Sequence, residues 1–419
     1  MVEAALRSGT AQRRSVFELF GRRLPEGRRY GVVAGVGRAL DAIESFRFDD
    51  AAIASLEGVV GDDLLQWLST YSFSGDVWGY AEGEVYFPHS PVLVVEGTFA
   101  EAVLLETVLL SVYNHDSAIA SAASRMTLAA GGRPCIEMGS RRTHEEAAVA
   151  AARAAYVAGF STTSNLAARQ RYDVPTAGTA AHSFTLLHDS EEAAFRAQVE
   201  ALGKGTTLLV DTYDIAEAVR TAVEVAGPDL GAVRLDSGDL GEIAREVRAQ
   251  LDSLGATRTR ILVTSDLDEY AIAALAAAPV DGYGVGTQLV TGSGHPTCGF
   301  VYKLVAREDD GGEMVSVAKR SKDKLSIGGR KHALRRLTAD GVAEAEVVSI
   351  GEPPVDDDRS TGTSDRALLV PLVRGGEVVG RATLDEARER HLASRAELPR
   401  SVQMMSAGEP VIPTLHVGA

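Results

Sequence analysis

Short apolar runs alternate with longer segments of helical periodicity between about residues 130 and 305 of the sequence. A short apolar run bounded by turn residues is typical of a strand, whereas apolar positions three or four residues apart are typical of an amphipathic helix. The runs that we expect to form strands begin at residues 134, 156, 206, 232, 260, 281 and 299; they read PCIEMG, YVAGF, TTLLVDTY, AVRLD, RILVTSD, DGYGVG and GFVYKLV. The region is therefore predicted to consist of strand and helix units in alternation.

The segments between these runs carry the signals of helix starts and ends. In the segment 237–255, SGDLGEIAREVRAQLDSLG, Ser237 or Asp239 is placed to cap the start of a helix and Gly255 to end it. Thr143 and Glu146 have the spacing of a capping box at the start of a second helix. A strand, a helix and a strand within about 20 to 30 residues indicate parallel βα units, and about seven such units favour a closed (β/α) barrel over an open sheet.

The flanks of this region have a different pattern. The stretch 83–97, GEVYFPHSPVLVVEG, suggests antiparallel strands, and 99–126 is apolar nearly all round, as expected of a long buried helix. Charged and glycine-rich segments at 307–333 and 351–366 are expected to be loops. Short strands, ALLVPLV and VIPTLHV, are predicted near the end of the chain.

Composition limits the classes of protein that this chain can be. With 419 residues, 45% hydrophobic and 24% charged, it is long enough for more than one globular domain. Its formal net charge of -16 argues against a nucleic-acid partner, because phosphate backbones are bound by clusters of Lys and Arg. The two cysteines, Cys135 and Cys298, lie far apart without a CxxC motif, so we expect reduced buried thiols rather than disulfides or a zinc-thiolate site.

The sequence also carries no sign of a membrane segment. No apolar stretch reaches the roughly 18 residues that cross a bilayer, and the first 20 residues lack the continuous apolar region of a secretory signal. We therefore expect a cytoplasmic protein without a membrane partner.

Polar residues gather at positions where the predicted strands end. Arg234 and Asp236 stand near the end of the strand at 232, and Asp266 at the end of the strand at 260. The stretch GVGT at 284–287 follows a third strand and brings backbone amides and a hydroxyl together, an arrangement that can hold a phosphate group. An arginine beside an aspartate can equally be a structural ion pair. Several such positions on the face where barrel loops converge nevertheless favour a functional site.

Other motifs are incomplete. The stretch GVVAGVGRAL lacks the third glycine of a dinucleotide-binding loop, and ALGKGTT lacks the earlier glycine and the adjacent hydroxyl of a Walker loop. No pair of the nine histidines has the spacing of a zinc site, so a metal would be Mg²⁺ brought by a phosphate ligand. Between Met126 and Phe300 the only lysine is Lys204, which precedes a predicted strand; this argues against a Schiff-base barrel enzyme.

Segments in a characteristic order suggest one enzyme family: GSRRTHEEAA, GFSTTSN, PTAGTAAHSF, VRLDSGDL and GYGVGTQLVTG. With them the chain resembles the nicotinate phosphoribosyltransferases over essentially its whole length. The resemblance implies an α/β fold, with an irregular (β/α) barrel beside an α+β domain built from both chain ends. The implied parts are an N-terminal α+β domain at 1–125, a barrel carrying the active site at 126–306, and a C-terminal segment at 307–419 that returns to the first domain.

The same resemblance implies an activity and partners. Enzymes of this kind form nicotinate mononucleotide and pyrophosphate from nicotinate and 5-phosphoribosyl 1-pyrophosphate (PRPP) in NAD salvage. They use Mg²⁺ and couple the reaction to ATP, a co-substrate, through a phosphohistidine. A homodimer with the active site near the subunit interface is implied as well.

Roles for individual residues follow from the resemblance. His182 corresponds to the histidine that ATP phosphorylates, whereas a lone histidine is otherwise more often a core residue. Thr179 and Arg234 would contact nicotinate, since a carboxylated pyridine needs a cation and hydroxyl donors. Asp236 would orient the ribose hydroxyls or the base. The residues that would hold PRPP and its phosphates are Arg141, Arg142, Gly284, Gly286, Thr287 and Asp266.

Ser164 bears on which form of the pyridine is used. In the related nicotinamide-using enzymes an aspartate occupies the matching place in the loop. An ionised aspartate would accept a hydrogen bond from an amide but repel a carboxylate, so serine suits the acid.

One departure from the family pattern leaves a second reading open. Family members usually begin with a stretch resembling Thr-Asp-x-Tyr-x-Leu-Thr-Met, whose tyrosine stacks on the pyridine. This chain starts with MVEAALRSGTAQRR, which fits the residues from that methionine onward. The alternative to an active enzyme is therefore a non-catalytic or impaired homologue with a ligand-binding or regulatory role.

Overall fold

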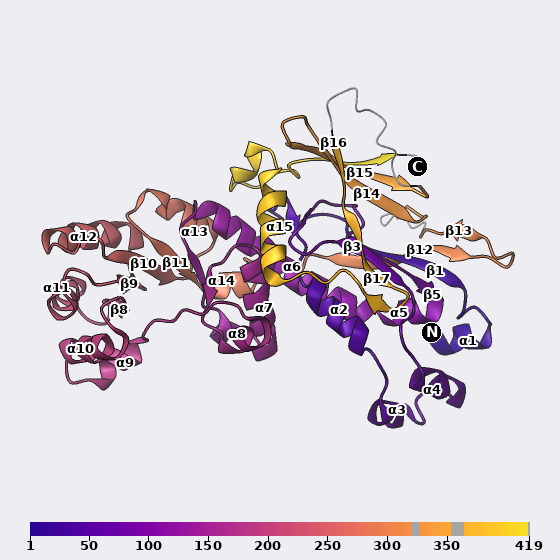
Figure 1. Ribbon diagram of the computed structural model, residues 1–419, viewed down its shortest axis with the longest axis horizontal. Coiled ribbons are helices and arrows are strands. Elements are labelled where there is room, and N and C mark those ends of the chain that lie inside the picture. Colours follow the sequence, from indigo (N-terminus) through magenta and orange to yellow (C-terminus); the bar gives the residue numbers. More distant parts are fainter. Residues whose placement is uncertain (320–326, 353–363, 418–419) are drawn as a thin grey trace. The chain divides into compact units, whose positions relative to one another are not determined.

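The computed structural model describes residues 1–319, 327–352 and 364–417. The chain forms two compact units (Figure 1). One, which we call the terminal unit, consists of Met1–Ser121 and His295–Ala419; the other, the central unit, is Ala122–Gly294. The boundary between them falls within helix α6 (Glu106–Ala129).

The central unit is built on a six-stranded sheet with the order β7-β6-β11-β10-β9-β8. All neighbouring strands in this sheet are parallel. The sheet is an open half barrel, so the predicted irregular (β/α) barrel is confirmed, whereas the closed ring suggested by the number of strand-like runs does not form. The strands are β6 (Cys135–Glu137), β7 (Thr162–Thr163), β8 (Thr207–Leu209), β9 (Ala232–Leu235), β10 (Arg260–Ser265) and β11 (Gly282–Val285).

Helices connect these strands, and polar side chains cap several of them by accepting hydrogen bonds from first-turn amides. Asp239 caps α12 (Leu240–Ser253), and Gly255 follows its end with a φ of 78°. Both features agree with the sequence pattern. The other helices of this unit are α7 (Glu145–Val157), α8 (Leu166–Tyr172), α9 (His182–Leu187), α10 (Glu191–Leu202), α11 (Ile215–Ala226), α13 (Glu269–Ala274), α14 (Thr287–Val290), and the 3₁₀ turns η1 (Ser140–Arg142) and η2 (Leu275–Ala277).

Some local predictions are wrong. The run YVAGF at 156 is not a strand, because the alanine-rich helix α7 continues to Val157 and its helix propensity outweighs that of one tyrosine and one valine. Helix α7 is capped by His144, whose ring accepts from the Glu146 amide, and not by Thr143. The run GFVYKLV at 299 forms β12 (Phe300–Glu308), which pairs antiparallel with a strand of the terminal unit.

The terminal unit draws its strands from both chain ends, as expected of the α+β domain. A seven-stranded sheet has the order β13-β12-β1-β5-β3-β17-β18, a four-stranded sheet the order β16-β14-β15-β19, and β2 pairs with β4. The strands are β1 (Arg14–Gly21), β2 (Gly31–Val32), β3 (Asp76–Tyr80), β4 (Val85–Tyr86), β5 (Leu93–Thr98), β13 (Met314–Ser316), β14 (Lys331–Leu337), β15 (Ala343–Ile350), β16 (Ser364–Ala367), β17 (Leu369–Arg374), β18 (Glu377–Val378) and β19 (Thr414–Val417). The helices are α1 (Val2–Arg7), α2 (Val36–Ser45), α3 (Asp50–Leu56), α4 (Asp62–Ser69), α5 (Phe99–Leu104), α15 (Leu384–Ala396) and η3 (Arg400–Gln403).

The flanking segments follow their patterns only in part. The apolar segment 99–126 forms two helices, α5 and α6, on either side of Leu105. The segment 307–333 contains the end of β12, all of β13 and the start of β14 instead of a loop alone. The parts of the predicted loops at 320–326 and 353–363 lie outside the described residues.

A set of charged residues is enclosed in the terminal unit, and we call it the buried charge cluster: Glu84, Arg335, Glu346, Arg366 and Glu397. Arg335 and Glu346 are both 0% exposed, and the Arg335 guanidinium donates to Glu346 at 2.6 Å. Arg366 donates to Glu84 at 2.9 Å and to Glu397 at 2.7 Å. These contacts join β14, β15 and β16 to Glu84, which directly precedes β4, and to Glu397, which directly follows α15. The cluster therefore connects segments from both chain ends within this unit.

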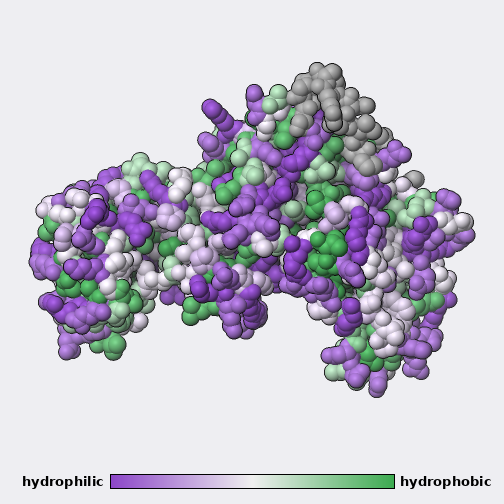
Figure 2. Space-filling model, in the orientation of Figure 1, coloured by the Kyte–Doolittle hydropathy of each residue, from purple (hydrophilic) through white to green (hydrophobic). Residues whose placement is uncertain are grey.

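The face drawn in Figure 2 is mostly hydrophilic, with apolar side chains in smaller groups. Within the described ranges, no helix is both long enough and apolar enough to cross a membrane.

Candidate active site

A pocket of about 200 Å³ lies at the carboxyl edge of the central sheet. Because the strands are parallel, the loops that follow them share this edge. The pocket contains every residue expected to hold PRPP, together with Arg234 from β9 and Asp236, which directly follows that strand. It is lined by Met138, Arg141, Arg142, Arg234, Asp236, Thr264, Ser265, Asp266, Gly284, Gly286 and Thr287.

Glycines let the loops around this pocket lie close together. A Cβ atom on Gly284 would come within 2.5 Å of the Thr264 methyl carbon and 2.8 Å of the Met138 sulfur. A Cβ on Gly139 would come within 2.2 Å of Val290. Larger residues would therefore push β10, β11 and the loop after β6 apart. Gly286 directly precedes α14, whose first amides have no partner within the helix and remain available to a ligand.

Arg234 is held in place by groups from several loops. Its Nε donates to the Thr264 hydroxyl at 2.8 Å, and Nη1 donates to the Thr179 hydroxyl at 2.6 Å. Its Nη2 lies 3.0 Å from the Asp236 carboxylate. The side chain of Arg234 is 11% exposed and that of Asp236 is 26% exposed. The arginine is thus nearly buried, oriented by neutral hydroxyls and one carboxylate, and in contact with the pocket.

Asp236 carries a negative charge at neutral pH. Burial alone would raise its pKa, but the hydrogen bond from Thr264 and the positive charge of Arg234 outweigh burial and lower the pKa below its usual value. The pocket therefore combines a fixed carboxylate with the cationic side chains of Arg141 and Arg142, which are exposed on the η1 turn.

His182 is the first residue of α9 and is not a core histidine. Its side chain is 41% exposed, and its Nε2 lies 3.1 Å from the carboxylate of Asp211, which is only 1% exposed. The second oxygen of Asp211 accepts from the Asp236 amide at 2.8 Å and from the Ser237 hydroxyl at 2.9 Å. One buried carboxylate therefore connects the exposed imidazole to the loop that carries Asp236.

The remaining predicted residues lie beside the pocket and not among its lining residues. Thr179 reaches it through the hydrogen bond from Arg234. Ser164 is exposed on the loop after β7, at the same edge of the sheet, and its amide donates to the Glu137 carbonyl at 2.8 Å. The structure thus gathers the predicted residues at one edge, some in the pocket and some around it.

Sequence reasoning missed several residues that orient this site, among them Asp211, Thr264 and Glu137. Asp211 follows β8 and Thr264 lies near the end of β10. A polar residue at the end of an apolar run was the signal used for Asp236 and Asp266, and the same signal was available for Asp211. Glu137 and Thr264 gave no such signal in the sequence, because they act through contacts with residues on neighbouring strands.

The two cysteines are buried, and metal-binding side chains do not cluster within the described ranges. Cys135 and Cys298 are buried and free, and burial raises the pKa of the Cys135 thiol to about 12, so it stays protonated. Across 1–319, 327–352 and 364–417, no three His, Cys, Asp or Glu side chains converge on a metal position.

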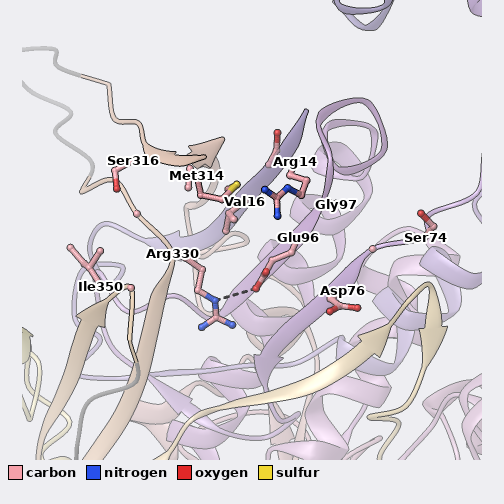
Figure 3. Close-up of a pocket in the computed structure, with 15 residues that line it drawn as sticks. Arg14, Val16, Ser74, Asp76, Glu96, Gly97, Met314, Ser316, Arg330 and Ile350 are labelled. Atoms are coloured by element: carbon pink, nitrogen blue, oxygen red, sulfur yellow. Dashed lines mark hydrogen bonds and ion pairs between the residues drawn. The ribbon is translucent and has the colours of Figure 1, made fainter. Parts of the chain in front are cut away.

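The terminal unit has a larger pocket of about 550 Å³, but its charges are already matched by the protein (Figure 3). Arg330 points toward Glu96 and donates to it at 3.1 Å. Asp76 accepts from Arg374 at 3.1 Å. None of the segments that resemble the enzyme family contributes to this pocket. The smaller pocket in the central unit is therefore the candidate active site.

Comparison with known families covers both units. Residues 1–114 match the nicotinate phosphoribosyltransferase (NAPRTase) N-terminal domain. Residues 134–336 match the nicotinate phosphoribosyltransferase (NAPRTase) family.

Individual proteins agree with these matches. The chain is 58% identical to the nicotinate phosphoribosyltransferase pncB1 of Mycobacterium tuberculosis, covering 100% of this chain and 93% of that protein. It is 37% identical to the nicotinate phosphoribosyltransferase of Bacillus subtilis, over 86% of this chain and 76% of that protein. The crystal structure of human nicotinic acid phosphoribosyltransferase matches with a TM-score of 0.83 and 26% identity, covering 100% of this chain and 96% of that chain. The chain belongs to the nicotinate phosphoribosyltransferase family.

Proposed function

We propose that the protein transfers the 5-phosphoribosyl group of PRPP to nicotinate, forming nicotinate mononucleotide and pyrophosphate. The observation that carries the proposal is the convergence, in one pocket, of exposed arginines, a glycine-rich turn and carboxylates on loops that follow parallel strands. A diphosphate sugar needs this combination, because arginines and backbone amides bind phosphate while carboxylates bind hydroxyls or a metal.

The substrates are assigned to different parts of the site. Arg141, Arg142 and the turn at 284–287 bind the phosphates of PRPP. The nicotinate carboxylate binds Arg234 and Thr179, with Ser164 as the neighbouring hydroxyl. Arg234 suits an acid, because two neutral hydroxyls and only one carboxylate hold its guanidinium in place.

Mg²⁺ fits the donor set that the pocket offers. This ion is usually held by one or two carboxylates together with substrate phosphates, so the lack of a three-residue cluster does not argue against it. Asp236 and Asp266, which both line the pocket, would hold it. When bound with PRPP, the ion neutralises the charge of the departing pyrophosphate.

The chemical step exchanges one bond for another at the ribose C1. The C1–O bond to pyrophosphate breaks and its electron pair leaves with the pyrophosphate, while the lone pair of the pyridine nitrogen forms the new C1–N bond. Positive charge develops on the ribose as the bond breaks. The carboxylate of Asp236, ionised at neutral pH, stabilises this charge and orients the ribose hydroxyls.

ATP enters through His182. The Asp211 carboxylate accepts from Nε2–H, which leaves the lone pair of the imidazole on Nδ1. In our proposal this nitrogen attacks the γ-phosphorus of ATP, the bond to ADP breaks, and the phosphohistidine is hydrolysed during each turnover. An imidazole that is 41% exposed has the access that such a reaction needs.

The test is an assay with purified protein, nicotinate, PRPP and Mg²⁺, with and without ATP. We expect nicotinate mononucleotide and pyrophosphate in equal amounts, and a faster reaction with ATP. Failure to form the mononucleotide under either condition would overturn the proposal and favour a non-catalytic ligand-binding protein. The proposed homodimer is tested on the same sample by its mass in solution.

Replacing His182 separates the coupling to ATP from the phosphoribosyl transfer itself. Asparagine keeps much of the size and one hydrogen bond but cannot form a phosphoramidate. We expect His182→Asn to show no acid-labile label from γ-³²P-ATP and no stimulation by ATP, with slow ATP-independent synthesis retained. His188→Asn, on the neighbouring turn, is the matched control and should still be labelled. A His182→Asn variant that still incorporated label would exclude His182 as the phosphorylated residue.

A further inference from the structure

We propose that Glu137 is a positioning residue that fixes the loop carrying Arg141 and Arg142 against the loop carrying Ser164. The proposal rests on the proposed function, because it assigns the two loops to PRPP and nicotinate. It adds a link between the substrate sites: one side chain, in contact with neither substrate, sets the geometry of both.

Glu137 is the last residue of β6, where it lies between the two loops. Strand β6 pairs with β7 on one side and β11 on the other, and Glu137 is 0% exposed. One carboxylate oxygen accepts from the Gly139 amide, at the start of the loop that carries Arg141 and Arg142, which we call the arginine loop. The other oxygen accepts from the Thr163 hydroxyl, at the start of the loop that carries Ser164, which we call the serine loop. The backbone carbonyl of Glu137 also accepts from the Ser164 amide at 2.8 Å.

A second hydrogen bond fixes the direction of the contact with Thr163. The Asn165 amide donates to the Thr163 hydroxyl oxygen at 2.9 Å. The threonine donates its own hydrogen to Glu137, whose two carboxylate oxygens both accept. The side-chain amide of Asn165 in turn donates to the Ser140 hydroxyl at 3.0 Å, which closes a ring of contacts between the two loops.

The geometry leaves little room for adjustment. The arginine loop packs so tightly against the turn after β11 that a Cβ on Gly139 would come within 3.0 Å of the Gly286 carbonyl oxygen. A shift of Gly139 would thus move Arg141 and Arg142 relative to the glycine-rich turn. Burial raises the pKa of Glu137, while the hydrogen bonds from Thr163 and Gly139 oppose this. A buried carboxylate is costly, so an isosteric core residue would suit stability alone better.

Substitutions at the two ends of the link should have different effects. Glu137→Gln keeps the size, but its amide NH₂ removes one of the two accepting oxygens, and the loss of the negative charge weakens the hydrogen bond to the other. Both loops are then held less firmly, and we expect KM for nicotinate and KM for PRPP each to rise about tenfold, with a smaller change in kcat. Thr163→Val removes only the serine-loop contact, so KM for nicotinate should rise and KM for PRPP should change less than about twofold. Thr163→Ser keeps the hydroxyl and should restore the wild-type values.

The matched control is Glu346→Gln, which also neutralises a carboxylate that is 0% exposed but lies in the buried charge cluster. It should lower the melting temperature without changing either KM. If Glu137→Gln behaves like this control, or if Thr163→Val raises both KM values equally, the positioning role is wrong. If Glu137→Gln does not fold, the comparison of Thr163→Val with Thr163→Ser still tests the positioning role.

A readout that is independent of turnover separates this proposal from the proposed function. Amide hydrogen exchange at Gly139 and Ser164 should be slow in the wild type and faster by at least about tenfold in Glu137→Gln, with Glu346→Gln unchanged at these amides. If the wild type forms no mononucleotide but the exchange rates follow this pattern, the proposed function fails and the link between the loops stands. Unchanged exchange at both amides would overturn the link whatever the activity.

Discussion

Two of the regions where arginines and carboxylates meet, the buried charge cluster and the edge of the central sheet, differ in their degree of enclosure. In the buried charge cluster, Arg335 and Glu346 are 0% exposed, and Arg335 also donates to the Val85 carbonyl at 2.8 Å. At the edge of the central sheet, Arg234 contacts an aspartate that is 26% exposed and borders a pocket with two exposed arginines. An ion pair alone therefore does not mark a site; what marks it is access to charges that a ligand can still bind.

The two regions also differ in what orients the arginine. Arg335 is surrounded by the carboxylates of Glu84, Glu346 and Glu397, so its charge is neutralised by the protein itself. Arg234 is oriented by the hydroxyls of Thr179 and Thr264 and by a single carboxylate, that of Asp236, so its charge is opposed by fewer carboxylates than that of Arg335. The first arrangement serves the fold, and the second leaves a positive charge directed at a ligand.

The largest expected effect is the loss of stability on removing the arginine at the centre of the buried charge cluster. Arg335→Met should lower the free energy of unfolding by about 3 to 5 kcal/mol, because it leaves Glu346 buried without its cation and leaves Glu84 with Arg366 alone. Urea unfolding measures this loss. The double variant Arg335→Met/Glu346→Gln should regain part of it, and KM for nicotinate should remain at the wild-type value. A loss below about 1 kcal/mol would mean that water already reaches the cluster.

Removing the arginine at the pocket should affect binding instead of folding. Arg234→Ala should lower kcat/KM for nicotinate by about 10-fold to 150-fold, the equivalent of losing a hydrogen bond to a charged group worth about 1.5 to 3 kcal/mol. Its cost in unfolding free energy should be smaller than that of Arg335→Met. Arg234→Lys should recover only part of the activity, because a single ammonium cannot bind a carboxylate through two donors. A wild-type kcat/KM in the alanine variant would place the nicotinate carboxylate elsewhere.

The sequence alone predicted the residues of the pocket better than the residues that hold them in position. Arg234, Asp236 and the turn at 284–287 follow apolar runs, and a strand end in a parallel sheet fixes the edge on which a residue stands. The helix at 240–253 was predicted equally well from the sequence, since its apolar periodicity and its capping residue Asp239 both agree with the structure. Signals that lie within one segment were therefore sufficient.

The sequence did not predict the features that depend on which strands pair. An apolar run such as GFVYKLV does not show whether its neighbour will be parallel or antiparallel, and β12 pairs with β1 from the other end of the chain. Glu137 and Thr264 act through contacts with residues on neighbouring strands. Their roles appear only when the strand order is known.

The smallest effect concerns the carboxylates beside His182. Glu191 begins α10 close to Asp211 and Asp214, and burial together with their negative charges raises its pKa to about 7. Its position in the first turn of a helix favours the charged form, yet this effect is weaker than the repulsion. In the buried charge cluster the neighbouring carboxylates are paired with Arg335 and Arg366, whereas here the negative charges of Asp211 and Asp214 act on Glu191 beside the site.

Glu191→Gln should therefore change how the stability of the protein depends on pH. A carboxyl whose pKa is raised from the usual 4.5 to about 7 binds more protons in the folded than in the unfolded state between these values, so its contribution to stability is present at low pH and is lost as the pH rises through this window. Glutamine resembles the protonated form at every pH. We expect the variant to match the wild type in urea unfolding at pH 5 and to exceed it at pH 8 by less than about 1 kcal/mol, because solvent screens the partly exposed side chain. Glu192→Gln, on the next residue, also removes a carboxylate from the first turn of α10 and is the matched control. Parallel stability curves for Glu191→Gln and the wild type would mean that Glu191 is ionised in the folded protein throughout, and that the carboxylates beside His182 are as fully compensated as those around Arg335.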